Sequence, residues 1–189
     1  MLKKKLFSSI PSGAVIALSM LLLLVLPLSL AACSGPAPAS TPDITATPTQ
    51  TTTHSAKPSG PIDAKWIESQ VVGDTVSIPV SEIEDNWNTH FKLQTADGDI
   101  VTMAYILNGV IYVRASICPP CRSQGFTLNG NILVCDICGT TFAASTGEGI
   151  SGACVNYPKA SVSYTIADGK VVMSRADLVT AYQNTLKPG

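Results

Sequence analysis

The stretch CPPCRSQGFTLNGNILVCDICGTTF, residues 118–142, holds four cysteines in two CxxC pairs, with thirteen residues between Cys121 and Cys135. A two-residue gap lets both sulfurs of a pair face one point. Two such turns side by side can complete a tetrahedron of thiolates, which Zn²⁺ and iron both accept. Zinc sites with two CxxC pairs have a middle gap of about 15 to 20 residues, close to the one here. The pattern predicts four metal ligands: Cys118, Cys121, Cys135 and Cys138.

The residues around these pairs predict a mainly β domain with a minor α part. Residues 75–80 and 90–95 alternate apolar and polar positions, as half-buried strands do. Residues 100–107 and 110–116 flank Asn108-Gly109, a strong hairpin signal. Each CxxC is then a turn at a strand end, so we expect a small zinc-ribbon-like or Rieske-like sheet.

Other turns and one helix complete the expected domain. Asn129-Gly130 turns the chain between the cysteine pairs, and Asp168-Gly169 predicts a further hairpin. The last segment begins with Ser174 as a helix cap, with Asp177 three residues on and apolar residues at helical spacing. We therefore expect a C-terminal helix.

The two CxxC turns, here called the first and second knuckle, differ in the N–H donors and positive charge near their sulfurs. Gly139 can adopt a positive φ that turns backbone N–H groups toward sulfur. Pro119 and Pro120 in the first pair have no N–H to donate, and we expect Arg122 to supply positive charge there. Asp136 lies between two ligands, so it should lower the reduction potential of a bound redox metal.

The first 32 residues resemble a bacterial lipoprotein signal peptide. Three lysines, Lys3 to Lys5, precede the apolar run 14–30, which ends in Leu-Ala-Ala before Cys33. This pattern predicts cleavage before Cys33 and attachment of lipid to its thiol, which would place the protein on the extracytoplasmic face of a cell membrane. The alternative is an uncleaved transmembrane anchor, since the run nearly suffices to span a bilayer.

Residues 33–60 are rich in Ser, Thr and Pro and predict a disordered tether, which leaves 61–189 as the folded metal-binding domain. The chain has 12 Lys or Arg against 13 Asp or Glu, and three of the lysines lie in the leader. The remainder is acidic, which argues against nucleic acid as a partner. We expect the membrane itself, and a redox or iron-transport protein within it, as partners.

The cysteines have three alternative roles: disulfides, a thioredoxin-type site and haem attachment. Export favours disulfides, but with Cys33 lipidated the five remaining cysteines cannot all pair. A thioredoxin-type site needs a helix after its CxxC, and residues 122–130 contain a turn instead. Haem attachment of the c type requires histidine after the second cysteine, where Arg122 and Gly139 stand.

His90 is the only histidine of the domain, so the domain has no catalytic triad signature. The sequence therefore favours a binding protein or electron carrier over an enzyme.

A longer motif extends this pattern. The first CxxC is followed by Gly125-Phe126, then by CxxCGxxF at 135–142, then by a glycine-rich loop at 147–154 that ends in Cys154, with Pro158 beyond. From about Val76 to Met173 the chain resembles the C-terminal domain of the FtrD-like membrane iron–sulfur proteins.

The resemblance implies an iron–sulfur cluster or another metal centre outside the membrane, used in iron uptake or electron transfer. It implies Cys118, Cys121, Cys135 and Cys138 as ligands and Cys154 as a fifth thiol that replaces one of them or covers the site. No arginine precedes Arg114, so the leader has no twin-arginine signal and the chain is expected to cross the membrane unfolded. That favours zinc or a single iron ion bound after export.

Overall fold

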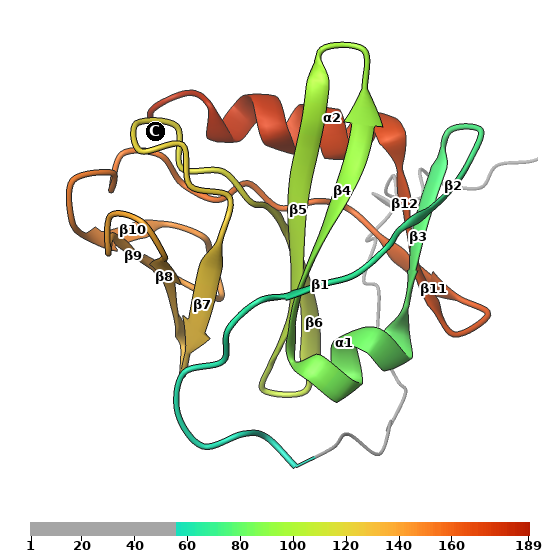
Figure 1. Cartoon of the computed structure of the whole chain (residues 1–189), viewed down its shortest axis with the longest axis horizontal. Helices are drawn as coiled ribbons and strands as arrows, with labels where there is room; N and C mark the ends of the chain where they lie inside the picture. Colours follow the sequence, from blue (N-terminus) through green and yellow to red (C-terminus); the bar gives the residue numbers. More distant parts are fainter. Residues whose placement is uncertain (1–55) are drawn as a thin grey trace, which may run out of the picture. The chain divides into compact units, whose positions relative to one another are not determined.

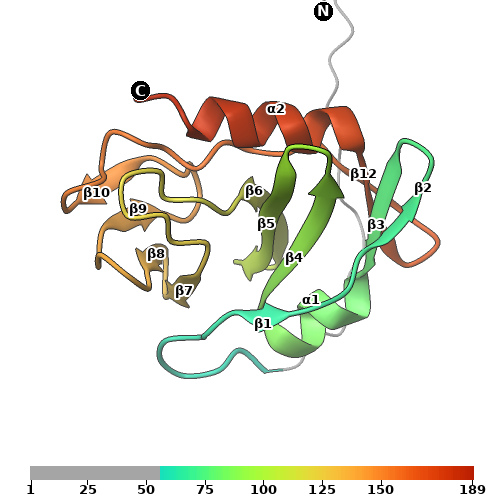
Figure 2. The same cartoon turned by 45° about the horizontal axis from the view of Figure 1, so that its top comes forward.

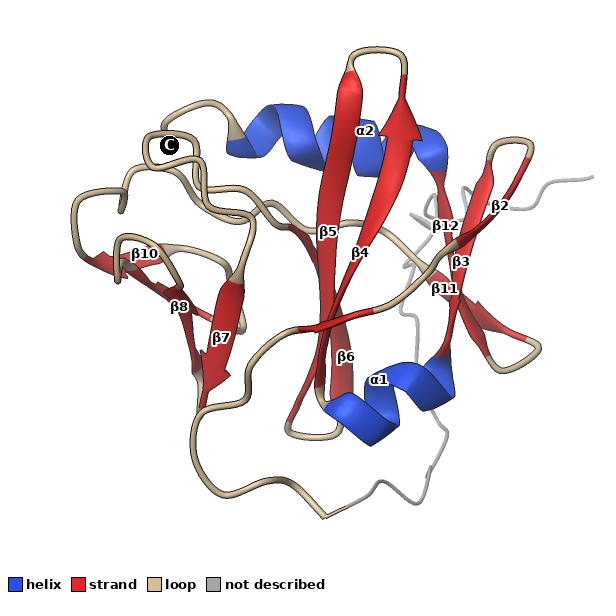
Figure 3. Cartoon of the chain, viewed as in Figure 1, coloured by secondary structure: helices blue, strands red, loops and turns tan. Residues whose placement is uncertain are grey.

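The computed structural model describes residues 56–189; the expected signal peptide, Cys33 and most of the tether lie outside the described residues. Within that part, twelve strands form three four-stranded sheets, accompanied by two helices (Figure 3). The expected mainly β class is confirmed.

The central sheet has the order β1-β4-β5-β6 (Figure 1). Strand β1 pairs in parallel with β4, and the other pairs are antiparallel. Asn108 and Gly109 both have positive φ, 53° and 78°, as a two-residue hairpin turn requires, so this hairpin is confirmed. The strands are β1 (Lys65–Trp66), β4 (Asn88–Thr95), β5 (Gly98–Leu107) and β6 (Val110–Ala115).

A second sheet has the order β11-β12-β3-β2 and is antiparallel throughout. The predicted turn at Asp168-Gly169 joins its two last strands, with φ of 50° and 69°. The sheet thus unites an early and a late part of the chain. Its strands are β2 (Gln70–Val72), β3 (Thr75–Pro79), β11 (Thr165–Ala167) and β12 (Lys170–Ser174).

The third sheet, of order β10-β9-β8-β7, carries the cysteine motif. The expected hairpin of β7 and β8 is present, but its two turn residues are Gly130 and Asn131, one position later than predicted, because Asn129 still pairs with Ile132. The second CxxC connects β8 to β9. The chain before β1 is tied to this sheet, because Ile62 and Leu128 exchange backbone hydrogen bonds of 2.8 and 2.9 Å. The strands are β7 (Phe126–Asn129), β8 (Ile132–Cys135), β9 (Thr141–Ala143) and β10 (Gly149–Ser151).

The C-terminal helix α2 (Arg175–Thr185) begins as predicted: the Asp177 N–H donates to Ser174 Oγ at 2.9 Å. It packs against β5, β6 and β12 and runs along one side of the central sheet (Figure 2). Helix α1 (Val80–Asn86) was not predicted from the sequence. It has only seven residues, follows Pro79 directly, and ends where Trp87 adopts a left-handed φ of 62°.

One continuous core joins the sheets. Its largest fully buried side chains include Phe91 and Tyr105 in the central sheet and Phe126 and Phe142 in the cysteine-bearing sheet. Cys118, Cys135 and Cys154 belong to the same buried cluster. Three of the candidate ligands are thus part of the core, and Cys121 and Cys138 pack against it. Among the described residues no helix has the length and apolar character needed to cross a membrane.

Candidate metal centre

The first CxxC forms a tight turn directly after β6. The Arg122 N–H donates to the Cys118 carbonyl at 2.7 Å, and the Cys118 N–H donates to the Ser123 carbonyl at 2.8 Å. Arg122 adopts a left-handed φ of 59° to close the turn. The turn brings Cys121 Sγ within 3.8 Å of the Cys118 carbonyl oxygen and within 4.8 Å of Cys118 Sγ.

The second CxxC repeats this turn at the end of β8. The Gly139 N–H donates to the Cys135 carbonyl, and the Cys135 N–H donates to the Thr140 carbonyl, both at 2.9 Å. Gly139 has the expected positive φ, 66°. The two knuckles therefore share one backbone hydrogen-bond pattern, but the first places an arginine where the second has the glycine that suits that conformation.

A third segment, the end of the glycine-rich loop that follows β10, carries Cys154. Gly152 has a φ of 116°, and a Cβ on it would lie 2.6 Å from Thr140 Oγ1 and 2.7 Å from Thr140 Cα. Only glycine lets the loop lie this close to the second knuckle. The Cys154 N–H donates to Thr140 Oγ1 at 3.2 Å, and the same oxygen is 3.2 Å from Cys138 Sγ. Thr140 thereby joins the loop to the knuckle.

Five sulfurs from these three segments form one group. The Sγ–Sγ distances are 4.0 Å for Cys118 and Cys138, 3.6 Å for Cys121 and Cys135, and 3.7 Å for Cys138 and Cys154. The five thiols are not paired in disulfides. The structure thus brings together every cysteine that the sequence placed in the site.

Four of these sulfurs form the tightest set, and it differs from the predicted one. The sulfurs of Cys118, Cys121, Cys138 and Cys154 all lie within 4.8 Å of one another. Cys135 is adjacent to Cys121 but is not a member of this set. Which of Cys135 and Cys154 completes the ligand set stays a prediction.

The donor set fits a single metal ion. Zinc–sulfur bonds of about 2.3 Å in a tetrahedron place neighbouring sulfurs about 3.8 Å apart. Within the tightest set, the Sγ–Sγ distances of 3.7 Å (Cys138 and Cys154) and 4.0 Å (Cys118 and Cys138) lie near that value, and no pair is more than 4.8 Å apart. Clusters with several irons distribute their thiolates over more than one iron. The compact set of sulfurs therefore favours one ion, zinc or iron.

Burial and hydrogen bonding give these thiols different acidities. Burial raises the pKa of Cys118, and hydrogen bonds with Cys154 and Cys121 act in the same direction. Burial also raises the pKa of Cys135. Burial also acts to raise the pKa of Cys138. Hydrogen bonds from Thr140 and from the neighbouring thiols outweigh burial there and lower the pKa of Cys138 to about 6. Cys138 therefore ionises more readily than Cys118 or Cys135.

The cation beside the sulfurs is not the expected one. Arg122 is exposed, whereas Lys159 is only 1% exposed and belongs to the segment that follows Cys154. Arg114 on β6 holds this segment: its Nη1 donates to the Lys159 carbonyl at 2.9 Å and its Nη2 to the Ser145 carbonyl at 2.6 Å. Lys159 was not predicted as part of the site, because no local pattern in the sequence distinguishes it from a surface lysine.

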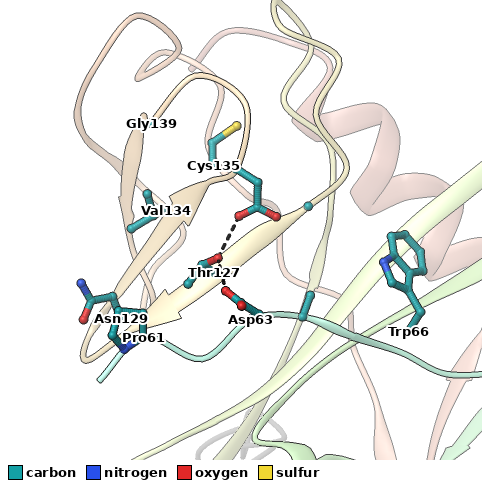
Figure 4. A pocket seen from close by; sticks show the side chains of 11 residues that line it. Pro61, Asp63, Trp66, Thr127, Asn129, Val134, Cys135 and Gly139 are labelled. Atoms are coloured by element: carbon teal, nitrogen blue, oxygen red, sulfur yellow. Dashed lines mark hydrogen bonds between the residues drawn. The ribbon is translucent and has the colours of Figure 1, made fainter. Parts of the chain in front are cut away.

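A cavity of about 650 Å³ lies behind the second knuckle and is lined by β7, β8 and the segment before β1. In it the Thr127 hydroxyl lies 3.2 Å from Asp63 Oδ1 and 2.9 Å from Asp136 Oδ1. The Cys135 sulfur points away from these groups, and Trp66 lies across the cavity (Figure 4). Asp136, expected to act on the metal, is thus exposed and engaged with Thr127.

His90 lies outside the cysteine group. It is fully buried in β4, with Trp66 packed edge-on at 5.5 Å between ring centroids. Burial lowers its pKa to about 4, against a weaker opposing contribution from the Gln124 backbone. His90 therefore stays neutral near pH 7.

The fold and the cysteine group together define a small β domain with a thiolate metal site. A family model described as "Membrane iron-sulfur containing protein FtrD-like" matches residues 83–184, and the chain belongs to this family. The match spans both knuckles and the loop that carries Cys154. Family membership and the four-cysteine group support the conclusion that this protein binds a metal.

Two solved structures are partly similar to this chain. A chain of the complex of reduced oxygenase and oxidized ferredoxin in carbazole 1,9a-dioxygenase is 17% identical, with a TM-score of 0.45, over 54% of this chain and 94% of that one. A ferredoxin from Sphingomonas yanoikuyae B1 is 24% identical, with a TM-score of 0.36, over 39% of this chain and 74% of that one. A search of curated proteins found no match.

Proposed function

We propose that this protein is a membrane-anchored, extracytoplasmic electron carrier with one iron ion held by four cysteine thiolates, and that it serves iron uptake or a related redox system. The observation that carries the proposal is the convergence of sulfurs from three segments, with Cys118, Cys121, Cys138 and Cys154 all within 4.8 Å of one another. A bound iron ion would supply a one-electron couple.

The protein's own residues suit that role. Cys118 and Cys154 are buried, which keeps water from one side of the site, while Cys121 and Cys138 are only half-buried. Next to Cys138, Ile137 is 67% exposed. A partner that approaches the knuckles would meet an apolar side chain beside the least buried ligands, which favours close contact and electron exchange on this side.

The membrane location rests on the sequence and the family. The family is described as membrane proteins, and the leader with Cys33 predicts a lipid anchor on the outer face. Two or more acyl chains would hold the domain at the surface, because each buried CH₂ contributes about 0.8 kcal/mol. Replacement of Cys33 by serine should release the protein from the membrane fraction; a Cys33→Ser protein that stays bound would overturn the lipid anchor.

Protein purified from its native membrane tests the metal assignment. We expect close to one iron per chain, visible absorption from sulfur-to-iron charge transfer, and reversible bleaching on reduction. Intact mass with and without reductant would show five unpaired thiols in the folded domain. Colourless protein whose mass rises by two hydrogens per disulfide on reduction would overturn the proposal.

A structural zinc site is the second candidate, and one observation favours it. No arginine precedes Arg114, so the leader has no twin-arginine signal and the chain would cross the membrane before its metal is bound. Zinc could then bind outside and stabilise the fold by roughly 10 kcal/mol or more. One zinc per chain in native material, with no visible absorption, would select this candidate.

A further inference from the structure

Lys159 is the buried cation of the cysteine site. Its side chain is 1% exposed, and its Nζ donates to the Ile117 carbonyl at 2.7 Å, directly before the first ligand candidate. The same Nζ lies 4.3 Å from the centroid of the Phe142 ring and 5.2 Å from that of Phe126. Both rings belong to the sheet that carries the second knuckle.

Such burial is costly for an ammonium group unless its surroundings stabilise the charge. An ammonium has three N–H donors, of which the Ile117 carbonyl takes one. The faces of two phenylalanine rings attract a cation at these distances. Burial lowers the pKa of Lys159, and the charges of Cys118, Cys135, Cys154 and Cys121 act in the opposite direction.

The site needs that charge. Four thiolates around a divalent ion leave two negative charges, and a trivalent ion leaves one, in a largely buried place. Backbone N–H groups near the sulfurs normally offset part of this charge, but Pro119 and Pro120 in the first knuckle have none to donate. Arg122 is exposed. Lys159 stands within the core on the side of Cys118.

We propose that Lys159 is a positioning residue for the metal centre: its fixed charge stabilises the bound thiolates, most strongly in the reduced, more negative form, and so raises the reduction potential. The proposal rests on the proposed thiolate centre and adds the residue that sets its charge balance. Lys159 acts by its charge from beside the ligands, where its Nζ donates to the carbonyl of the residue before Cys118, and does not itself bind the metal.

Two measurements on the full folded chain test this role. Cobalt(II) titration of the metal-free protein reports binding through sulfur-to-cobalt absorption, and voltammetry of the iron-loaded protein reports the potential. The neutral variants are Lys159→Met, which nearly preserves volume, and Lys159→Gln, which can still donate to the Ile117 carbonyl. The control is Lys92→Met, because Lys92 also lies over a ring, 5.5 Å from the Trp66 centroid, but is exposed.

We expect both neutral variants to bind cobalt at least tenfold more weakly and to shift the reduction equilibrium at least tenfold toward the oxidised form, about 59 mV lower for one electron. Lys92→Met should leave both values unchanged. If the wild type shows the cobalt band and Lys159→Gln has the same cobalt affinity and reduction potential, the role of Lys159 is overturned while the metal centre stands. Wild-type protein that shows no thiolate band would remove the proposed metal centre and this inference with it.

Discussion

The backbone N–H of Cys154 donates a 3.2 Å hydrogen bond to Oγ1 of Thr140. Because that oxygen also lies 3.2 Å from Cys138 Sγ, the threonine connects the fifth cysteine to the second knuckle. A thiolate at Cys138 would accept the hydroxyl hydrogen while the oxygen accepts from Cys154. One side chain thus orders two candidate ligands.

Replacement of Thr140 by valine removes this link with little change of shape. We expect a loss of about 1–2 kcal/mol in the free energy of unfolding, since the buried Cys154 N–H is left without its acceptor. Chemical denaturation of the metal-loaded protein measures it. Thr141→Val is the matched control, because its hydroxyl makes a 3.3 Å bond at an exposed position; an equal loss in both variants would contradict the special role of Thr140.

Gly152→Ala tests the close approach of the Cys154 loop. The new Cβ would lie 2.7 Å from Thr140 Cα, and φ is 116°, so we expect a loss of about 2 kcal/mol or more together with faster metal release. Gly73→Ala is the control: its φ is 57° with nothing within 4 Å of the added Cβ, which should cost about 1 kcal/mol. Thermal unfolding and metal transfer to a chelator measure the two effects. If Gly152→Ala releases metal at the wild-type rate, the Cys154 loop does not help to hold the metal.

Serine variants of Cys154 and Cys135 decide the ligand set. If the four mutually close sulfurs bind the ion, Cys154→Ser should weaken cobalt binding by at least about tenfold and alter the thiolate absorption. Cys135→Ser should keep four thiolates and a spectrum close to the wild type. The reverse pattern would instead select the two CxxC pairs alone as ligands.

Asp136→Asn should raise the reduction potential of the iron-loaded protein, because it removes a negative charge between two ligand candidates. The rise should be modest, since Asp136 is exposed. Asp63→Asn removes a carboxylate that contacts the same Thr127 hydroxyl without lying between ligands, and should shift the potential less. Voltammograms that coincide for wild type and Asp136→Asn would discard this effect.

His90 should make the protein less stable in mild acid. Its pKa is lowered from 6.5 to about 4 in the folded state, so below pH 6.5 the unfolded chain binds the proton more readily. Stability is full above pH 6.5 and is lost as the pH falls toward 4, by roughly 3 kcal/mol in all. The measurement is the difference in unfolding free energy between wild type and His90→Gln, because metal loss in acid affects both proteins. Between pH 7 and 4 the wild type should lose roughly 3 kcal/mol of unfolding free energy relative to His90→Gln. A difference between the two proteins that does not change with pH would refute this role of His90.

Local signals in the sequence were enough for most of the fold. The Asn108-Gly109 and Asp168-Gly169 turns require positive φ, and Ser174 caps a helix through its own hydroxyl, so these features follow from neighbouring residues. Helix α1 was not predicted, because seven residues are too few to show a clear helical period of apolar positions. The short strands β9 and β10 depend on pairing within the cysteine-bearing sheet, which local pattern does not reveal.

The site was predictable where chemistry repeats along the chain. The two CxxC pairs and Gly139 predicted the two CxxC turns, and the resemblance to the FtrD-like family implied that Cys154 lies near them. Tertiary structure alone brings Lys159 to the sulfurs, since it lies 42 residues from the Ile117 carbonyl that holds its Nζ. A buried lysine becomes visible only when the core around it is known.

X-ray absorption at the metal edge of natively purified protein tests the central claim most directly. We expect one metal ion per chain with four sulfur neighbours at about 2.3 Å and no nitrogen or oxygen ligand. A first shell that contains nitrogen or oxygen, or fewer than four sulfurs, would contradict the convergence of these cysteines on one ion.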